Sequence, residues 1–268
     1  MIAIDPRKCI GCGNCLDKCP CRSIILTSGK AVFDKSRGCI RCMHCGAACP
    51  ENAITYDGRP SCVSEGLPAI PDSFPDDLDD LIMTRRSYRI FKDKAVPEEE
   101  IRHALEVASW APSAKNQHPT KYYLIQGREQ VDRVTEIIMD DIREKQDARL
   151  ELLKAYEEGN NKVFGTATTA ILAYARNNAV NPQTDTAIKL ATAELVLQSR
   201  GFGTCWSGYL MRNLNGVDKL REIFPVPENN QFYGCLLVGY PDEKYLRIPE
   251  RLKRPDISIP HFDQILDR

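Results

Sequence analysis

The sequence predicts an α+β protein made of two units, a small cysteine-rich N-terminal domain and a larger domain of mixed helices and strands. Nine of the twelve cysteines fall within the first 49 residues. A segment rich in proline and aspartate follows, and beyond it apolar residues recur at helical spacing, with a few short apolar runs between the helices. We expect domains at residues 1–58 and 78–268, joined by a linker at 59–77.

Composition narrows the classes of function. The chain has 268 residues, 43% of them hydrophobic, and a net charge of -1, so a sizeable core is expected. Lysine and arginine are scattered, which makes nucleic acid an unexpected partner. No stretch approaches the roughly 18 apolar residues of a membrane span. The N-terminus lacks the apolar run of a secretion signal, and we therefore expect a cytoplasmic protein with no membrane partner.

A cysteine motif occurs twice in the N-terminal domain. Each copy reads C-x2-C-x2-C-x3-C-P, the bacterial motif for 4Fe-4S clusters, in which the fourth cysteine ligates the cluster of the other copy. One cluster then takes Cys9, Cys12, Cys15 and Cys49, and the other takes Cys39, Cys42, Cys45 and Cys19. A pair of zinc knuckles is the alternative, which the third cysteine at the same interval disfavours. Residues 1 to about 58 resemble the two-cluster bacterial ferredoxins, and the resemblance implies two short hairpins and helices.

The remaining cysteines are assigned no metal. Cys21 lies beside a ligand but outside both motifs, and Cys62, Cys205 and Cys235 are isolated. Isolated cysteines are most often small core residues.

The second domain begins with a helix after a run of aspartates at 76–80, since acidic residues favour the positive end of a helix. Helices are predicted over 98–109 and 184–200. A charged helical insert over about 140–161 is a candidate lid, with a solvated helix as the ordinary alternative. Strands are predicted at 122–126, 169–175 and 232–239. The stretch 201–209 is interpreted as a glycine-rich loop after a helix.

Several motifs of this domain are informative only when they are taken together. They are the basic run at 85–89, residues 111–119, the glycine-rich stretch 201–209, residues 239–241 and the basic run at 251–255. In this order they resemble the FMN-dependent nitroreductase family from about residue 78 to the C-terminus. The resemblance implies a nitroreductase-like α/β domain that binds FMN at the interface of a homodimer.

Carried over position by position, the resemblance implies three groups of FMN contacts. Arg85, Arg86, Ser87 and Arg89 would contact the phosphate and ring edge, with Lys253 and Arg254 closing on the phosphate. Pro112, Ser113, Ala114 and Asn116 would lie against the FMN of the other subunit, and Trp206, Ser207 and Gly208 near flavin N5. Asn160, Asn161 and Lys162 are alternatives for the pyrimidine edge, and His118 stands where the family often has glutamine. No catalytic acid or base is nominated.

These features predict a reductase in which two clusters carry single electrons from a low-potential donor to FMN, which reduces a small acceptor. Ferredoxin or a similar protein is the expected donor and NAD(P)H the second candidate, although no G-x-G-x-x-G motif follows a predicted strand. The expected acceptors are nitroaromatics, quinones and activated alkenes. Two alternatives stay open: an electron-transfer module for a partner oxidoreductase, and a flavoenzyme whose clusters are structural or sense oxygen.

Overall fold

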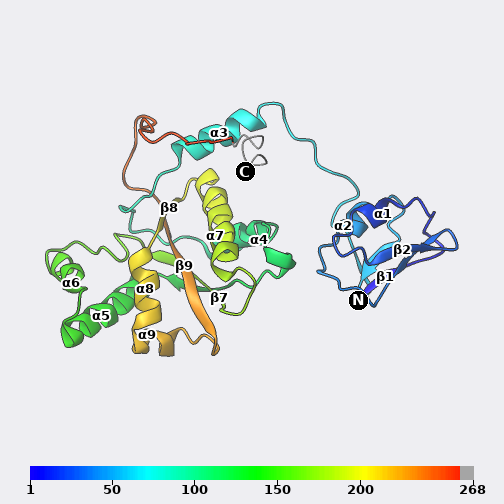
Figure 1. Ribbon diagram of the computed structural model, residues 1–268. Coiled ribbons are helices and arrows are strands. Elements are labelled where there is room, and N and C mark those ends of the chain that lie inside the picture. The colour runs from blue at the N-terminus through cyan, green and yellow to red at the C-terminus, as the bar shows by residue number, and fades with distance from the viewer. Residues whose placement is uncertain (260–268) are drawn as a thin grey trace, which may run out of the picture.

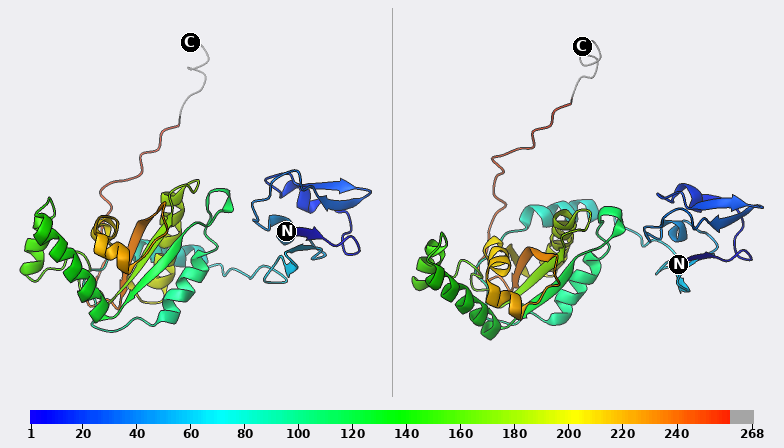
Figure 2. Two further views of the ribbon diagram at one scale, coloured as in Figure 1. Left: turned by 90° about the horizontal axis from the view of Figure 1, so that it is seen from below. Right: turned by 60° about the horizontal axis from the view of Figure 1, so that its bottom comes forward.

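The computed structural model describes residues 1–259 and contains two units joined by an extended segment (Figure 1). The N-terminal unit lies beside the second unit, on the side of helix α4 (Glu98–Ala108), in all three views (Figures 1 and 2). No helix among residues 1–259 is long and apolar enough to span a membrane.

The N-terminal unit consists of two hairpin-like sheets and two single-turn helices. Its elements are β1 (Ile2–Ile4), α1 (Asn14–Asp17), β2 (Ile24–Thr27), β3 (Lys30–Phe33), α2 (His44–Ala47), β4 (Ile54–Tyr56) and β5 (Arg59–Pro60). The sheet orders are β1-β4-β5 and β2-β3, all antiparallel. Each helix contains the third cysteine of its motif, Cys15 in α1 and Cys45 in α2, so the sequence repeat is also a structural repeat. Because β5 pairs with β4, the unit reaches Pro60, two residues beyond the predicted boundary.

The second unit is built around one antiparallel sheet of order β6-β7-β9-β8. Its strands are β6 (Lys121–Gln126), β7 (Thr169–Arg176), β8 (Gly203–Trp206) and β9 (Asn230–Gly239). Its helices are α3 (Phe74–Thr84), α4, the 3-10 turn η1 (Ala114–Asn116), α5 (Arg128–Lys145), α6 (Leu150–Glu157), α7 (Pro182–Ser199), α8 (Gly208–Gly216) and α9 (Asp218–Ile223).

Helices cover both faces of this sheet, which explains why β7 is apolar along nearly its whole length. Ile171 and Ala173 pack with α4 and α7 in one cluster, whereas Ala170, Leu172 and Tyr174 pack with α5, α6, α8 and α9 in the other. This alternation follows from the two-residue period of a strand. Figure 1 shows α4 and α7 on one side of the sheet and α5, α8 and α9 on the other.

Three predicted features differ from the observed ones. The stretch at 201–209 is not a simple loop, because residues 203–206 form the edge strand β8. The insert at 140–161 is not one solvated helix: it contains the end of α5 and all of α6, whose Leu152 and Leu153 are buried in the core. Helix α3 begins at Phe74, four residues before the expected domain start.

Candidate functional site

The eight motif cysteines lie around two small, separate cavities of the N-terminal unit. Cys9, Cys12, Cys15 and Cys49 line the first cavity, and Cys19, Cys39, Cys42 and Cys45 line the second. The fourth cysteine of each motif thus lies with the first three of the other motif. This is the crossed arrangement that the repeat predicts.

The surroundings of these thiols suit iron-sulfur clusters. Backbone N-H groups donate to sulfur in the same way in both halves, from Ser23 to Cys19 Sγ and from Ala53 to Cys49 Sγ, each at 3.3 Å. The pKa of Cys45 is raised to about 11, first by burial and then by the neighbouring thiolates, of which Cys19 contributes most. Crowded thiolates of this kind are stabilised by bound cationic iron, and soft sulfur ligands select it.

Most of the cysteines outside the two motifs are in positions that packing accounts for. Cys205 and Cys235 are buried in the core of the second unit, and Cys62 is half-buried in the segment after β5. Cys21, which belongs to neither motif, also borders the second cavity.

A much larger cavity, of about 640 Å³, opens in the second unit between the end of α6 and the start of α8. Its wall contains groups suited to an anionic, aromatic ligand: Arg89, the polar residues 160–162, Trp206 and the first turn of α8. Trp206 is 39% exposed and is therefore a wall of the cavity rather than a core residue.

The first turn of α8 presents backbone donors to this cavity. Ser207 caps the helix, since its Oγ accepts from the N-H of Leu210 at 3.2 Å and donates to the carbonyl of Val163 at 2.7 Å. The N-H groups of Gly208 and Tyr209 make no hydrogen bond within residues 1–259. The positive end of the helix dipole therefore points at the cavity, which favours an electron-rich ligand.

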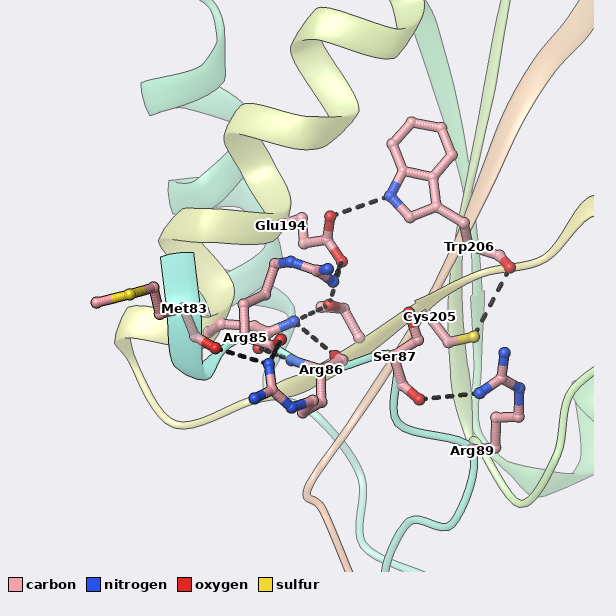
Figure 3. A network of polar contacts seen from close by, with 10 residues as sticks. Met83, Arg85, Arg86, Ser87, Arg89, Glu194, Cys205 and Trp206 are labelled. Carbon is pink, nitrogen blue, oxygen red and sulfur yellow. Dashed lines mark hydrogen bonds and ion pairs between the residues drawn. The ribbon is translucent and has the colours of Figure 1, made fainter. Parts of the chain in front are cut away.

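The basic run at 85–89 lies along β8, where Ser87 and Thr204 form a parallel bridge. Figure 3 shows how its arginines are held. Arg85 Nη1 lies 3.3 Å from Oε1 of Glu194, and Arg86 donates to backbone carbonyls, with its Nε buried and unpartnered. Arg89 Nη1 donates to the carbonyl of Ser87 at 3.1 Å, and of these predicted residues it alone lines the cavity.

The structure places the other predicted residues in three locations. Trp206, Ser207 and Gly208 line the cavity together with Arg89. Pro112, Ser113, Ala114 and Asn116 belong to a loop that does not border it. Lys253 and Arg254 lie in the exposed segment at 244–259, where Arg254 pairs with Glu250 and neither contacts the basic run.

The three alternatives for the pyrimidine edge all line the cavity but differ in what their side chains do. The side-chain oxygen of Asn161 already has partners within the chain, because its Oδ1 accepts from the N-H groups of Val163 and Phe164. Lys162 lies 3.6 Å from Glu151. Asn160 is exposed and makes no side-chain hydrogen bond within residues 1–259, which leaves its amide free for a ligand.

Two functional carboxylates escaped the sequence reasoning. Glu194, only 6% exposed, accepts from Trp206 Nε1 at 3.0 Å and from Thr204 Oγ1 at 2.9 Å besides its pairing with Arg85. Asp185, 2% exposed, accepts from the N-H of Ala114 at 2.9 Å. Both lie on the inward face of α7, and the available signal was an acid at a position where the helical period calls for an apolar residue.

Comparisons with known proteins match this geometry. Residues 82–240 match the nitroreductase family, and residues 1–50 match the 4Fe-4S dicluster domain. An Archaeoglobus fulgidus protein named as an NADH dehydrogenase/NAD(P)H nitroreductase is 28% identical over 170 residues, which cover 61% of this chain and 86% of that protein. An uncharacterized ferredoxin of Methanocaldococcus jannaschii is 43% identical over 56 residues, which cover 20% of this chain and 73% of the ferredoxin.

A solved structure shows the same fold for the second unit. The nitroreductase of Bacteroides fragilis with bound FMN aligns with a TM-score of 0.57 at 23% identity, over 69% of this chain and 99% of that chain. The fused iron-sulfur and flavin units, with their separate cysteine-lined and helix-capped cavities, are thus each matched by a known domain. The chain therefore belongs to the nitroreductase family and is an FMN-dependent, nitroreductase-like oxidoreductase that carries an N-terminal 4Fe-4S ferredoxin domain.

Proposed function

We propose that the protein is a homodimeric reductase in which two 4Fe-4S clusters carry electrons from a low-potential donor to FMN for the reduction of a small acceptor. A nitroaromatic, a quinone or an activated alkene is the expected acceptor. The observation that carries the proposal is the combination, on one chain, of two cavities each lined by four motif cysteines with a cavity bordered by Arg89 and the first turn of α8.

FMN, when bound, supplies the step that joins single electrons from clusters to two-electron reduction of an acceptor. The protein's residues bind and orient it. Arg85, Arg86, Ser87 and Arg89 would hold its phosphate and ring edge through charge-assisted hydrogen bonds, and Lys253 and Arg254, which lie in the exposed segment at 244–259, would close on the phosphate when FMN binds. The N-H groups of Gly208 and Tyr209 offer donors to the ring where negative charge grows on reduction, and Asn160 serves the pyrimidine edge.

A second copy of the chain is the proposed occupant of two exposed apolar surfaces. Helix α3 buries none of its residues, although Phe74, Leu78 and Ile82 recur at four-residue spacing on one face. The segment at 244–259 exposes Leu246, Leu252 and Ile257, each by 80% or more. Because α3 leads directly into the basic run at 85–89, a copy that covers α3 also approaches the cofactor cavity.

The proposed donor is a reduced ferredoxin or similar protein, with NAD(P)H as the second candidate. Thiolates that hold clusters persist in reducing compartments, which supports a cytoplasmic location. No catalytic acid or base is proposed, since water reaches an open cavity and can protonate the product.

The test is anaerobic absorbance spectroscopy of the reconstituted protein. Reduced ferredoxin is added first and NAD(P)H in a separate sample, and each sample is then reoxidised with a nitroaromatic, a quinone or an enone. The proposal expects flavin and cluster bands to bleach together with ferredoxin and to recover rapidly with at least one small acceptor. Recovery only with a protein acceptor supports an electron-transfer module, and NAD(P)H bleaching that persists without clusters supports structural or sensing clusters.

An arginine pair tests the cofactor site separately. Arg89→Ala is expected to weaken FMN binding by about tenfold or more, because a charge-assisted bond contributes about 1.5–3 kcal/mol. Arg102→Ala is the matched control, since Arg102 lies on α4, is exposed and, among residues 1–259, pairs only with Glu98. Equal FMN affinity of the two variants would remove the basic run from the cofactor site.

A further inference from the structure

One hydrogen bond joins the two units within residues 1–259. Asn116 Nδ2, in the loop at 112–119, donates to the backbone carbonyl of Ile40 at 3.0 Å. Ile40 lies between the ligands Cys39 and Cys42 and lines the second cavity. The contact therefore attaches the loop to the wall of one particular cysteine site, and not to the cavity of Cys9, Cys12 and Cys15.

The loop is built to present Asn116 in this way. Asp185 Oδ1 accepts from the N-H of Ala114 at 2.9 Å, and Ser113 Oγ accepts from the N-H of His118 at 3.0 Å. His118 Nε2 lies 2.8 Å from Oδ1 of Asn116. Since the amide oxygen accepts from the imidazole, the amide nitrogen is left to donate to Ile40.

Backbone strain at the loop supports a functional role. Lys115, Asn116 and His118 have φ angles of 51°, 54° and 42°, in the left-handed region that residues with side chains rarely adopt. Such residues are strained, and strain of this kind persists only where the surrounding structure holds it. The bonds from Asp185 and Ser113 are what hold it here.

The same loop lies away from the cofactor cavity of its own chain. No residue of 112–119 lines that cavity. The loop is fixed to Asp185 near the start of α7, whereas Trp206 of the cavity wall donates to Glu194, which lies nine residues later on the same helix. At 1.5 Å per residue, the two anchoring points are about 13 Å apart along the helix axis. The loop therefore does not complete the cavity of its own chain and is available to a second copy, as the proposed dimer requires.

We infer that electrons cross between subunits: the second-cavity cluster, held by Cys19, Cys39, Cys42 and Cys45, reduces the FMN bound by the basic run of the partner chain. This inference rests on the proposed function, in which FMN lies at a dimer interface and the loop at 112–119 of one chain completes the site of the other. The first-cavity cluster is then the entry point. Asn116 is a positioning residue that holds the second cluster against the loop.

Mixed dimers test the route. One chain carries Arg85→Ala and Arg89→Ala with both clusters intact. The other carries Cys9→Ser, Cys12→Ser, Cys39→Ser and Cys42→Ser, so that it holds neither cluster, with its basic run intact. Two different affinity tags allow the mixed dimer to be isolated, and each such dimer binds one FMN, on the cluster-deficient chain. The readouts are the dipolar splitting in the EPR spectrum of the partly reduced dimer and the bleaching of the flavin band by reduced ferredoxin.

Transfer between subunits predicts that the mixed dimer shows the splitting and bleaches at a rate within about twofold of one wild-type site. Transfer within one chain predicts no splitting and a loss of ferredoxin-dependent bleaching, which would overturn the inference. A second mixed dimer, in which the arginine-deficient chain also carries Cys9→Ser and Cys12→Ser, is expected to keep the splitting. Loss of the splitting in that dimer, with the second cluster still present, would overturn the assignment of the proximal cluster.

A different result would contradict the proposed function itself. If the wild-type protein elutes as a monomer or retains no FMN, the dimeric flavin site is absent and the route has no acceptor. FMN content and molecular mass of the wild type are therefore measured before the mixed dimers are made.

Discussion

Trp206 donates from its indole Nε1 to Oε2 of Glu194 at 3.0 Å, and this bond ties the wall of the cofactor cavity to the middle of α7. The other oxygen of Glu194 accepts from Thr204 and lies 3.3 Å from Arg85. One carboxylate thus fixes an aromatic ring, the edge strand β8 and the start of the basic run (Figure 3).

Replacing this carboxylate should loosen all three groups. Glu194→Ala leaves Trp206, Thr204 and Arg85 without their acceptor, and we expect the free energy of unfolding to fall by about 2–3 kcal/mol. Glu194→Gln keeps an acceptor and should cost about half as much. Urea unfolding followed by far-UV circular dichroism measures both, since the long helices belong to the second unit. Wild-type stability of the alanine variant would contradict this role.

Substitutions at two glycines of the cavity wall distinguish the effect of a steric clash from the effect of backbone strain. Gly165 and Gly159 both have left-handed φ angles, +58° and +85°, but a Cβ at Gly165 would lie 2.2 Å from the carbonyl oxygen of Arg89, whereas one at Gly159 meets nothing within 4 Å. Gly159→Ala should cost about 1–2 kcal/mol from backbone strain alone. Gly165→Ala should cost more and also displace Arg89, so that FMN affinity falls. Equal FMN affinity in the two variants would show that the position of Arg89 is not critical.

The crossed cysteine sets predict which single substitutions behave alike. Cys19→Ser should lose about half of the bound iron, and its remaining EPR signal should match that of Cys39→Ser rather than that of Cys9→Ser. Cys21→Ser is the control, since Cys21 borders the same cavity but belongs to neither motif, and it should retain its iron. A match between Cys19→Ser and Cys9→Ser would mean that each motif holds its own cluster.

His118 should make the protein less stable in mild acid. Its pKa lies below the ordinary value, because burial disfavours the imidazolium and Lys189 repels it. As the pH falls below about 6.5, the unfolded chain takes up a proton that the folded chain refuses, so the free energy of unfolding decreases. His118→Gln should flatten this dependence between about pH 7.5 and 5.5, measured as the urea midpoint at each pH. Parallel pH profiles for the two proteins would assign the acid sensitivity to other groups.

The sequence was sufficient where local spacing carries the chemistry. The repeat of Cys9, Cys12 and Cys15 at Cys39, Cys42 and Cys45 predicted two groups of three cysteines, because three thiols so close together can reach only one small volume. The structure places each group of three around its own cavity. Periodicity likewise predicted α4 and α7 and the buried strands β7 and β9 to within a few residues, since each buries a regular apolar face.

The spacing of apolar residues did not predict the strand at the edge of the sheet. Strand β8 has four residues, one of them glycine, and its pairing with β9 is what makes it a strand. Nothing in a four-residue segment distinguishes such a strand from a loop. The same limit explains α6, whose charged residues suggested a solvated helix although Leu152 and Leu153 pack into the core.

The sequence by itself determined the cofactor chemistry: soft thiolates at cluster spacing and a set of basic and glycine-rich motifs typical of a flavin domain. Only the tertiary structure decided that Glu194 joins Arg85 to Trp206 and that Asn116 reaches Ile40. The physical reason is the separation of the interacting residues along the sequence. The first three ligands of each cluster and the helix caps are neighbours along the chain, and the repeated motif supplies the fourth ligand, whereas these two contacts join residues 109 and 76 positions apart with no motif to link them. Contacts of that separation arise only when packed helices and strands bring them together.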